Sequence, residues 1–149
     1  LILMFVGGCA ASTTCGIKIF RFQILNLFIK KQIKQIIYPN GVFPIKYRGE
    51  VIGDTFLTSV LTFVFLYIFI FFLLTALLSL SNLDFTTAIS AAATSLSNVG
   101  PGLGEIIGPN GSFKYLPDLT KWYLSIAMLL GRLEFFTVLV LFLPSFWRD

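Results

Sequence analysis

The sequence predicts an all-α membrane protein: a long helix, a short helix that enters the membrane without crossing it, a loop, and a second long helix. Of its 149 residues, 56% are hydrophobic and only 12% are charged, whereas soluble domains carry about 25% charged residues. Two long apolar segments, Phe56–Leu80 and Trp122–Trp147, flank the glycine-containing turn Ser97–Gly102. These observations favour a chain that folds in lipid.

The first long helix is expected over residues 55–80. Thr55–Leu80 contains no charged residue and exceeds the roughly 20 residues that cross a bilayer. Asp54 precedes it and is expected as its N-cap, where an oxygen accepts from free N–H groups. The second long helix is expected over residues 119–147, with Trp122, Tyr123 and Trp147 near its ends, because aromatic rings favour the headgroup level.

The short helix is expected over residues 85–97, as a pore helix. The uncharged stretch Phe85–Leu96 would rise only about 18 Å, against a hydrocarbon core of about 30 Å. Irregular backbone follows it, and lipid tolerates such backbone only where it lines protein or water. We therefore expect the carbonyl groups of Asn98, Val99, Gly100, Pro101 and Gly102 to form a cation filter that replaces an ion's hydration shell.

The N-terminal region is expected to be a membrane helix over residues 1–37 that is interrupted at residues 7–16. The interruption contains only small residues: Gly7, Gly8, Cys9, Ala10, Ala11, Ser12, Thr13, Thr14, Cys15 and Gly16. Small residues permit close packing of membrane helices, and a broken helix can also face an ion path. Both interpretations remain open from the pattern alone. The chain starts inside an apolar run without a basic region or cleavage site, which indicates a fragment rather than a signal peptide.

A basic block sets the expected orientation. Residues 18–48 hold seven of the 11 Lys and Arg residues and no acidic residue, so residues 38–54 are expected to form a cytoplasmic link. Flanking membrane segments already explain this block, and nucleic acid is not expected as a partner. The chain has no His, no metal-ligand cluster and no nucleophile motif, so we expect no enzyme activity, no resident metal and no cofactor.

Arg132 lies near the middle of the second long apolar segment. An arginine at mid-bilayer costs at least about 2.5–3.5 kcal/mol on insertion scales, so it should face a cavity or a partner. One interpretation is a barrier to cations in the pore. The other is a structural pair with Glu134, although residues i and i+2 point to different sides of a helix.

Three stretches together resemble the Trk/Ktr/HKT superfamily of potassium transporters, with a link that favours its TrkH-type bacterial subunit. The stretches are Gly7–Ser12, Asn98–Gly102 and Gly131–Glu134, and the link is Tyr38–Asn40 with Pro44. Asn98-Val99-Gly100-Pro101-Gly102 is similar to a degenerate potassium-channel filter, Thr-Val-Gly-Tyr-Gly.

The resemblance implies a fold of four repeats around one pore. Residues 1–37 would be the second helix of the third repeat and residues 55–149 the fourth repeat. Potassium would bind at Asn98, Val99 and Gly100, residues 7–16 would be the gate loop, and Arg132 would face the pore. Ala11, Thr14 and Cys15 stand where glycines are expected, and side chains there would stiffen the loop.

The implied setting is potassium uptake across the bacterial inner membrane. The implied partners are the lipid bilayer, the remaining repeats of the same protein, a second copy in a homodimer, and a cytoplasmic nucleotide-binding regulatory subunit. A proton gradient, a sodium gradient or voltage alone remain alternatives for the driving force. A truncated, non-conducting remnant that only contacts other membrane proteins is the alternative function.

Overall fold

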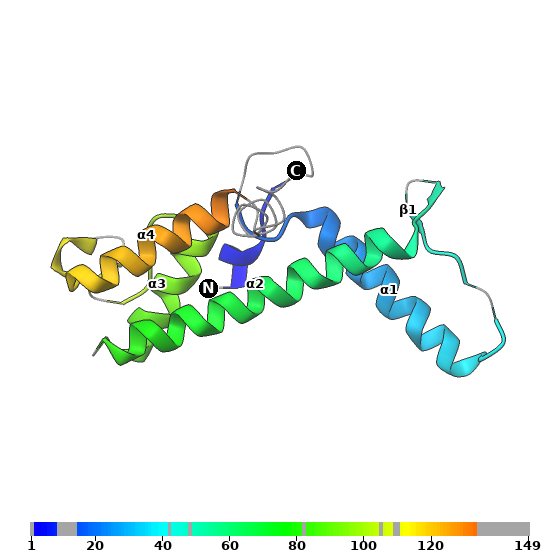
Figure 1. Ribbon diagram of the computed structural model, residues 1–149, viewed down its shortest axis with the longest axis horizontal. Coiled ribbons are helices and arrows are strands. Elements are labelled where there is room, and N and C mark those ends of the chain that lie inside the picture. The colour runs from blue at the N-terminus through cyan, green and yellow to red at the C-terminus, as the bar shows by residue number, and fades with distance from the viewer. Residues whose placement is uncertain are drawn as a thin grey trace, which may run out of the picture.

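The computed structural model describes residues 2–8, 15–41, 43–47, 49–81, 83–104, 106–108 and 111–133. Four α-helices dominate it (Figure 1). In chain order the elements are η1 (Ile2–Phe5), α1 (Ile19–Ile37), β1 (Lys46–Tyr47), β2 (Glu50–Val51), α2 (Asp54–Leu80), α3 (Phe85–Ser97), η2 (Phe113–Tyr115) and α4 (Asp118–Arg132).

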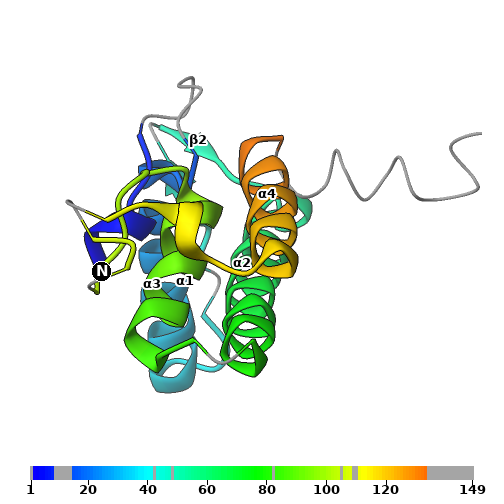
Figure 2. The ribbon, with the colours of Figure 1, turned by 90° about the vertical axis from the view of Figure 1, so that its left-hand side faces the viewer.

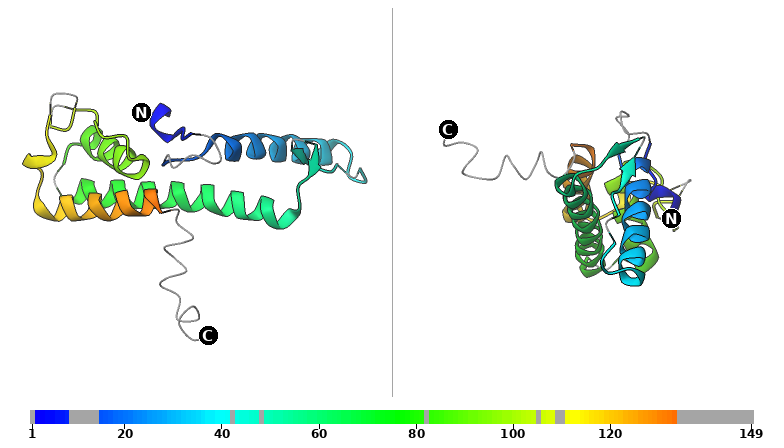
Figure 3. Two further views of the ribbon diagram at one scale, coloured as in Figure 1. Left: turned by 90° about the horizontal axis from the view of Figure 1, so that it is seen from above. Right: turned by 90° about the vertical axis from the view of Figure 1, so that its right-hand side faces the viewer.

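The 27-residue helix α2 runs the length of the molecule and is about 40 Å long. Two layers result: α2 and α4 lie in one, while α1 and α3 lie in the other (Figures 2 and 3). Along this second layer α1 covers the first half of α2, α3 covers the second half, and η1 lies between them. Within the described residues, α2 is the one helix long and apolar enough to cross a membrane, with a mean hydropathy of 2.8.

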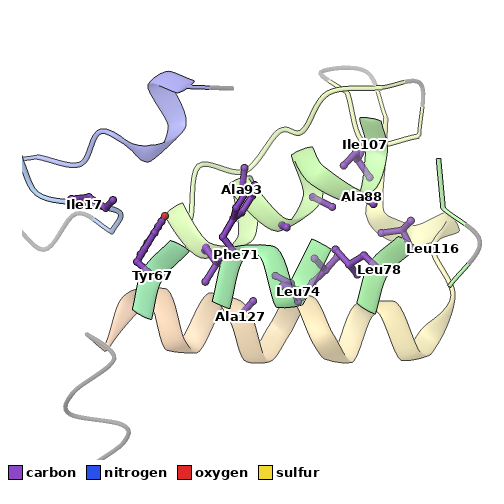
Figure 4. Close-up of a cluster of buried hydrophobic side chains, with 14 of the residues drawn as sticks. Ile17, Tyr67, Phe71, Leu74, Leu78, Ala88, Ala93, Ile107, Leu116 and Ala127 are labelled. Atoms are coloured by element: carbon purple, nitrogen blue, oxygen red, sulfur yellow. The ribbon is translucent and has the colours of Figure 1, made fainter. Parts of the chain in front are cut away.

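Two apolar clusters hold the layers together. The larger one joins Phe71, Leu74 and Leu78 of α2 to Ala88 of α3 and Ala127 of α4 (Figure 4). The smaller one packs Ile24 of α1 against Leu57 and Val60 of α2. Much of α2 still faces outward, since the side chains of Phe65 and Phe72 are 72% and 62% exposed. Apolar surface of this extent suits contact with lipid or with further membrane helices.

Helix α3 owes its central position to small side chains. Ala88, Ala91, Ala92 and Ala93 are fully buried, and small residues let helices approach closely without a driving force from water. Asp84 precedes the helix and accepts a hydrogen bond from the Thr86 hydroxyl, which lowers the pKa of the Asp84 carboxyl. The short helix therefore starts at an exposed acidic residue and runs into the protein interior.

Three details differ from expectation. Gly53, not Asp54, is the N-cap of α2, and Asp54 is the first residue inside the helix. There its negative charge still interacts favourably with the partial positive charge of the helix N-terminus. Lys46–Tyr47 and Glu50–Val51 pair as the two strands of a small antiparallel hairpin instead of irregular chain, and Gly49 between them adopts φ +92°. The expected interruption ends at Gly16, so the helix is expected to resume at Ile17, whereas α1 begins at Ile19. The expected span 133–147 lies outside the described residues, apart from Leu133.

Candidate functional site

The chain changes direction sharply where α3 ends. Asn98 is the C-cap and adopts a left-handed conformation, with φ 51° and ψ 44°. Its N–H donates to the Ser95 carbonyl at 3.2 Å, and the Val99 N–H donates to the Thr94 carbonyl at 3.1 Å. These bonds satisfy the last carbonyls of the helix. The next residues therefore leave the helix as a defined loop.

Gly100 is held by a side chain of the preceding helix. Its N–H donates to the Thr94 hydroxyl at 3.0 Å, and its φ is +112°. A Cβ built at Gly100 would meet nothing within 4 Å. Glycine is therefore needed for its backbone conformation, which other residues adopt at a cost, and not for lack of space.

Several carbonyl oxygens of the expected filter segment accept no hydrogen bond from the described residues. Residues 98–101 are all exposed, and no N–H or hydroxyl of the described residues donates to their carbonyls. Gly102 differs, because it is buried and its N–H donates to the Ile107 carbonyl at 2.8 Å. The segment thus offers consecutive free oxygens next to a firmly anchored residue.

Side-chain hydrogen bonds that the sequence analysis did not predict position this loop. The Asn98 amide donates to the Met128 carbonyl of α4 at 3.1 Å. The hydroxyls of Tyr67 and Ser97 lie 2.9 Å apart, and the Ser90 hydroxyl donates to the Leu103 carbonyl at 2.8 Å. The sequence did contain a signal for these contacts. The uncharged stretch that forms α3 carries several hydroxyl side chains, and buried hydroxyl groups require hydrogen-bond partners.

Helix α4 contacts the last turn of α3 through Gly131. A Cβ built on Gly131 would lie 2.9 Å from the Leu96 carbonyl carbon and closer still to its oxygen, so any side chain there would collide with backbone. Arg132, the next residue, is exposed and lies one turn beyond Met128, which accepts from Asn98. Arg132 is therefore on the turn of α4 that faces the end of α3. Glu134, its alternative partner, lies outside the described residues.

The expected gate loop is described at its two ends. Val6 and Ile17 form a parallel bridge, the Gly7 N–H donates to the Ile17 carbonyl at 3.0 Å, and the Ile17 N–H donates to the Phe5 carbonyl at 3.0 Å. A Cβ on Gly7 would lie 2.7 Å from the Cys15 carbonyl oxygen. Phe5 and Gly7 thus pair with Ile17 at the base of the expected loop. Of the loop itself, Gly7, Gly8, Cys15 and Gly16 are described, whereas Cys9, Ala10, Ala11, Ser12, Thr13 and Thr14 lie outside the described residues.

Aromatic contacts connect this base with the filter side. The Phe5 ring meets the rings of Tyr67 and Phe71 edge-on, at centroid distances of 6.1 and 5.1 Å. Tyr67 in turn contacts Ser97, the residue before the loop. Among the described residues no group of three His, Cys, Asp or Glu side chains could hold a metal ion. Backbone oxygens are the ligands that this site offers.

A short buried helix packed against a long apolar helix is an arrangement typical of a membrane transport protein. The sequence matches the model of the TrkH family, described as "Cation transport protein", over residues 1–148. The chain therefore belongs to the TrkH family, a transporter family and not an enzyme family, and the predicted resemblance is confirmed.

Named relatives agree with this assignment. The chain is 51% identical over 147 residues to "Trk system potassium uptake protein TrkI" of Halomonas elongata, covering 99% of the chain and 30% of that protein. It is 38% identical over 145 residues to "Trk system potassium uptake protein TrkH" of Vibrio parahaemolyticus, covering 97% and 29%. The chain thus spans about 30% of the length of these relatives.

The crystal structure of the potassium transporter TrkH from Vibrio parahaemolyticus shares the fold. It aligns with a TM-score of 0.87 at 36% identity and covers 99% of this chain and 31% of that one. The predicted all-α membrane fold is confirmed.

Proposed function

We propose that this chain supplies one filter segment and the gate loop to a protein that conducts potassium ions across the bacterial inner membrane. The proposal rests on the carbonyl oxygens of residues 98–101, which accept no hydrogen bond from the described part of the chain. The relatives reported above are potassium uptake proteins, which indicates the ion. An oxygen that no N–H group occupies is available to replace water around a cation.

The surrounding helix favours a cation at this position. The C-terminal end of α3 carries a partial negative charge, and α3 is buried along most of its length, which weakens screening by water. The anchors from Thr94 to Gly100 and from Asn98 to Met128 hold the loop on both sides. In this mechanism potassium binds at the carbonyls of Asn98, Val99 and Gly100, and three further repeats complete the ring.

Two elements would control flux on the far side of the filter. The segment 7–16 acts as the gate, since its paired base at Gly7 and Ile17 would hold a loop in the ion path. The Phe5 contacts with Tyr67 and Phe71 would fix that base to α2. Arg132 adds an electrostatic barrier, because a guanidinium in a site of low dielectric repels a passing cation.

The proposed assembly follows from the outward surface. Exposed apolar side chains on α2 and α4, including Phe65, Phe72 and Trp122, would contact lipid, the other repeats and a second copy in a homodimer. A cytoplasmic nucleotide-binding subunit would regulate opening from the side of the basic block.

The test compares two glycine variants in the full-length protein that carries this chain. Gly100→Ser should reduce potassium-over-sodium discrimination at least severalfold, because serine strains a backbone at φ +112° by about 1–2 kcal/mol. Gly49→Ser is the matched control, since Gly49 has φ +92° and its Cβ would also meet nothing within 4 Å. Flux of potassium and sodium is measured in proteoliposomes. Unchanged discrimination in Gly100→Ser would exclude Gly100 from the filter.

A further inference from the structure

A basic cavity lies between the C-terminal half of α1 and the chain that leads into the hairpin. Its volume is about 410 Å³, and four lysines line it: Lys30, Lys31, Lys34 and Lys46. Three of them come from α1 and the fourth from β1, so the tertiary fold brings the fourth charge to the other three. The remaining wall is apolar and includes Phe43 and Ile45.

Three of the four lysines have no carboxylate partner within the described part of the chain. Lys30 and Lys34 stand one helical turn apart, where like charges destabilise a helix. Only Lys31 has a carboxylate nearby, since Asp54 Oδ1 lies 3.8 Å from its Nζ and the Asp54 side chain is 92% exposed. Lys30, Lys34 and Lys46 contact no carboxylate of the described residues. A bound anion would relieve this repulsion.

The apolar surface beside the lysines favours an anion that also carries an apolar part. Lys34 Nζ lies 6.0 Å from the centre of the Phe43 ring, at the boundary between the two surfaces. Helix α1 also exposes large apolar side chains: Ile33, which lines the cavity, is 53% exposed, and Ile36 and Ile37, which lie beyond it, are 80% and 62% exposed. A helix with lysines on one side and exposed isoleucines on another suits the interface of a membrane. A free inorganic anion would use only the lysines.

We propose that this cavity binds the phosphate headgroup of an anionic phospholipid, with its acyl chains on the exposed isoleucines of α1. The phosphate would meet Lys30, Lys34 and Lys46, and the first carbons of the chains would meet Phe43 and Ile45. Basic pockets next to membrane helices attract anionic headgroups in this way. The bound lipid would fasten α1 to the hairpin on one membrane surface.

The test measures lipid binding by the purified full-length protein that carries this chain. Delipidated protein is mixed with vesicles of phosphatidylcholine alone or with added phosphatidylglycerol, and retained lipid is counted by native mass spectrometry. The double variant Lys30→Gln/Lys34→Gln should retain phosphatidylglycerol about tenfold less well. Lys114→Gln/Lys121→Gln removes equal charge away from the cavity and should retain it as the parent does. All of these proteins should retain phosphatidylcholine to the same extent.

Further variants keep the result decisive if the first fails to fold. Lys46→Gln changes the hairpin and not α1, and should also weaken retention, whereas Lys30→Arg/Lys34→Arg should keep it. If Lys30→Gln/Lys34→Gln and Lys114→Gln/Lys121→Gln lost phosphatidylglycerol to the same extent, the proposed site would be overturned. Complete displacement of phosphatidylglycerol by inorganic phosphate would overturn the lipid in favour of a free anion. Binding of polyglutamate without retention of phosphatidylglycerol would overturn it in favour of an acidic protein.

Discussion

Single polar side chains position the candidate filter. Thr94 lies in α3, six residues before Gly100, and only the turn at Asn98 brings its hydroxyl to 3.0 Å from the Gly100 N–H. Asn98 contributes twice, through a left-handed backbone and an amide that reaches Met128. Loop geometry is thus determined by a few hydrogen bonds, each worth about 0.5–1.5 kcal/mol.

Removal of the Thr94 hydroxyl tests this positioning role. Thr94→Val keeps the shape of the side chain but leaves the Gly100 N–H without its acceptor, so we expect potassium-over-sodium discrimination to fall severalfold and stability to fall by about 1 kcal/mol. Thr75→Val is the control, because the buried Thr75 hydroxyl donates within α2 to Phe71. Equal discrimination in both variants would show that the Thr94 bond is dispensable.

Neutralising Arg132 tests its role as a barrier. Arg132→Gln keeps much of the length and removes the charge, so potassium flux per folded molecule should rise. If Arg132 instead pairs with Glu134 in the interior, the change strands a carboxylate at a cost of about 3–5 kcal/mol. The protein would then be lost from the membrane, and Arg132→Gln/Glu134→Gln should restore it. Flux normalised to protein level in the single and double variants distinguishes the two outcomes.

At the level of elements, close approach of α3 and α4 sets the site. Alanines line α3, and Gly131 of α4 sits against the Leu96 carbonyl. The contact fixes the last turn of α3 relative to the turn of α4 that carries Arg132. Even one added methyl group at Gly131 would push the two helices apart and displace the start of the expected filter segment.

Gly131→Ala is the direct test of this crossing. The new methyl would collide with backbone at Leu96, which cannot turn aside as a side chain can, so we expect destabilisation by about 1–3 kcal/mol. Gly53→Ala is the control, since its Cβ would meet nothing within 4 Å. The midpoint of thermal unfolding in detergent compares the two. A midpoint as high for Gly131→Ala as for Gly53→Ala would contradict the close contact.

Across the whole molecule, α2 separates two ends of different character. The end of α1 and the hairpin lie at one end of α2, and η2 lies at the other (Figure 1). Lysines gather at the first end. By the positive-inside rule, we expect that end to face the cytoplasm.

Cysteine labelling tests the orientation. Lys34→Cys and Ser112→Cys place single reactive thiols at exposed positions in a full-length background with Cys9, Cys15 and any further cysteines changed to serine. A membrane-impermeant reagent should label Ser112→Cys in intact cells and Lys34→Cys only after the membrane is opened. The parent background serves as the unlabelled control. Labelling of both positions from one side would reject the topology.

The sequence alone determined the class of protein and the order of its helices. Charge-free runs, a run of small hydroxyl residues and a glycine turn are local features that can be recognised in the sequence. They predict structure well in a membrane protein, because backbone groups in lipid must form their hydrogen bonds within their own segment. Helix starts were less predictable: Gly53 replaced Asp54 as N-cap, since several neighbours can cap equally well.

Only the tertiary structure decided which side chains meet. The bond from Thr94 to Gly100, the fit of Gly131 on Leu96 and the gathering of Lys46 with the α1 lysines join residues through turns or between elements. Such contacts depend on the angles of turns at Asn98 and Gly49 and on how closely helices pack. Neither quantity has a local signature, because packing depends on the shape of both partners.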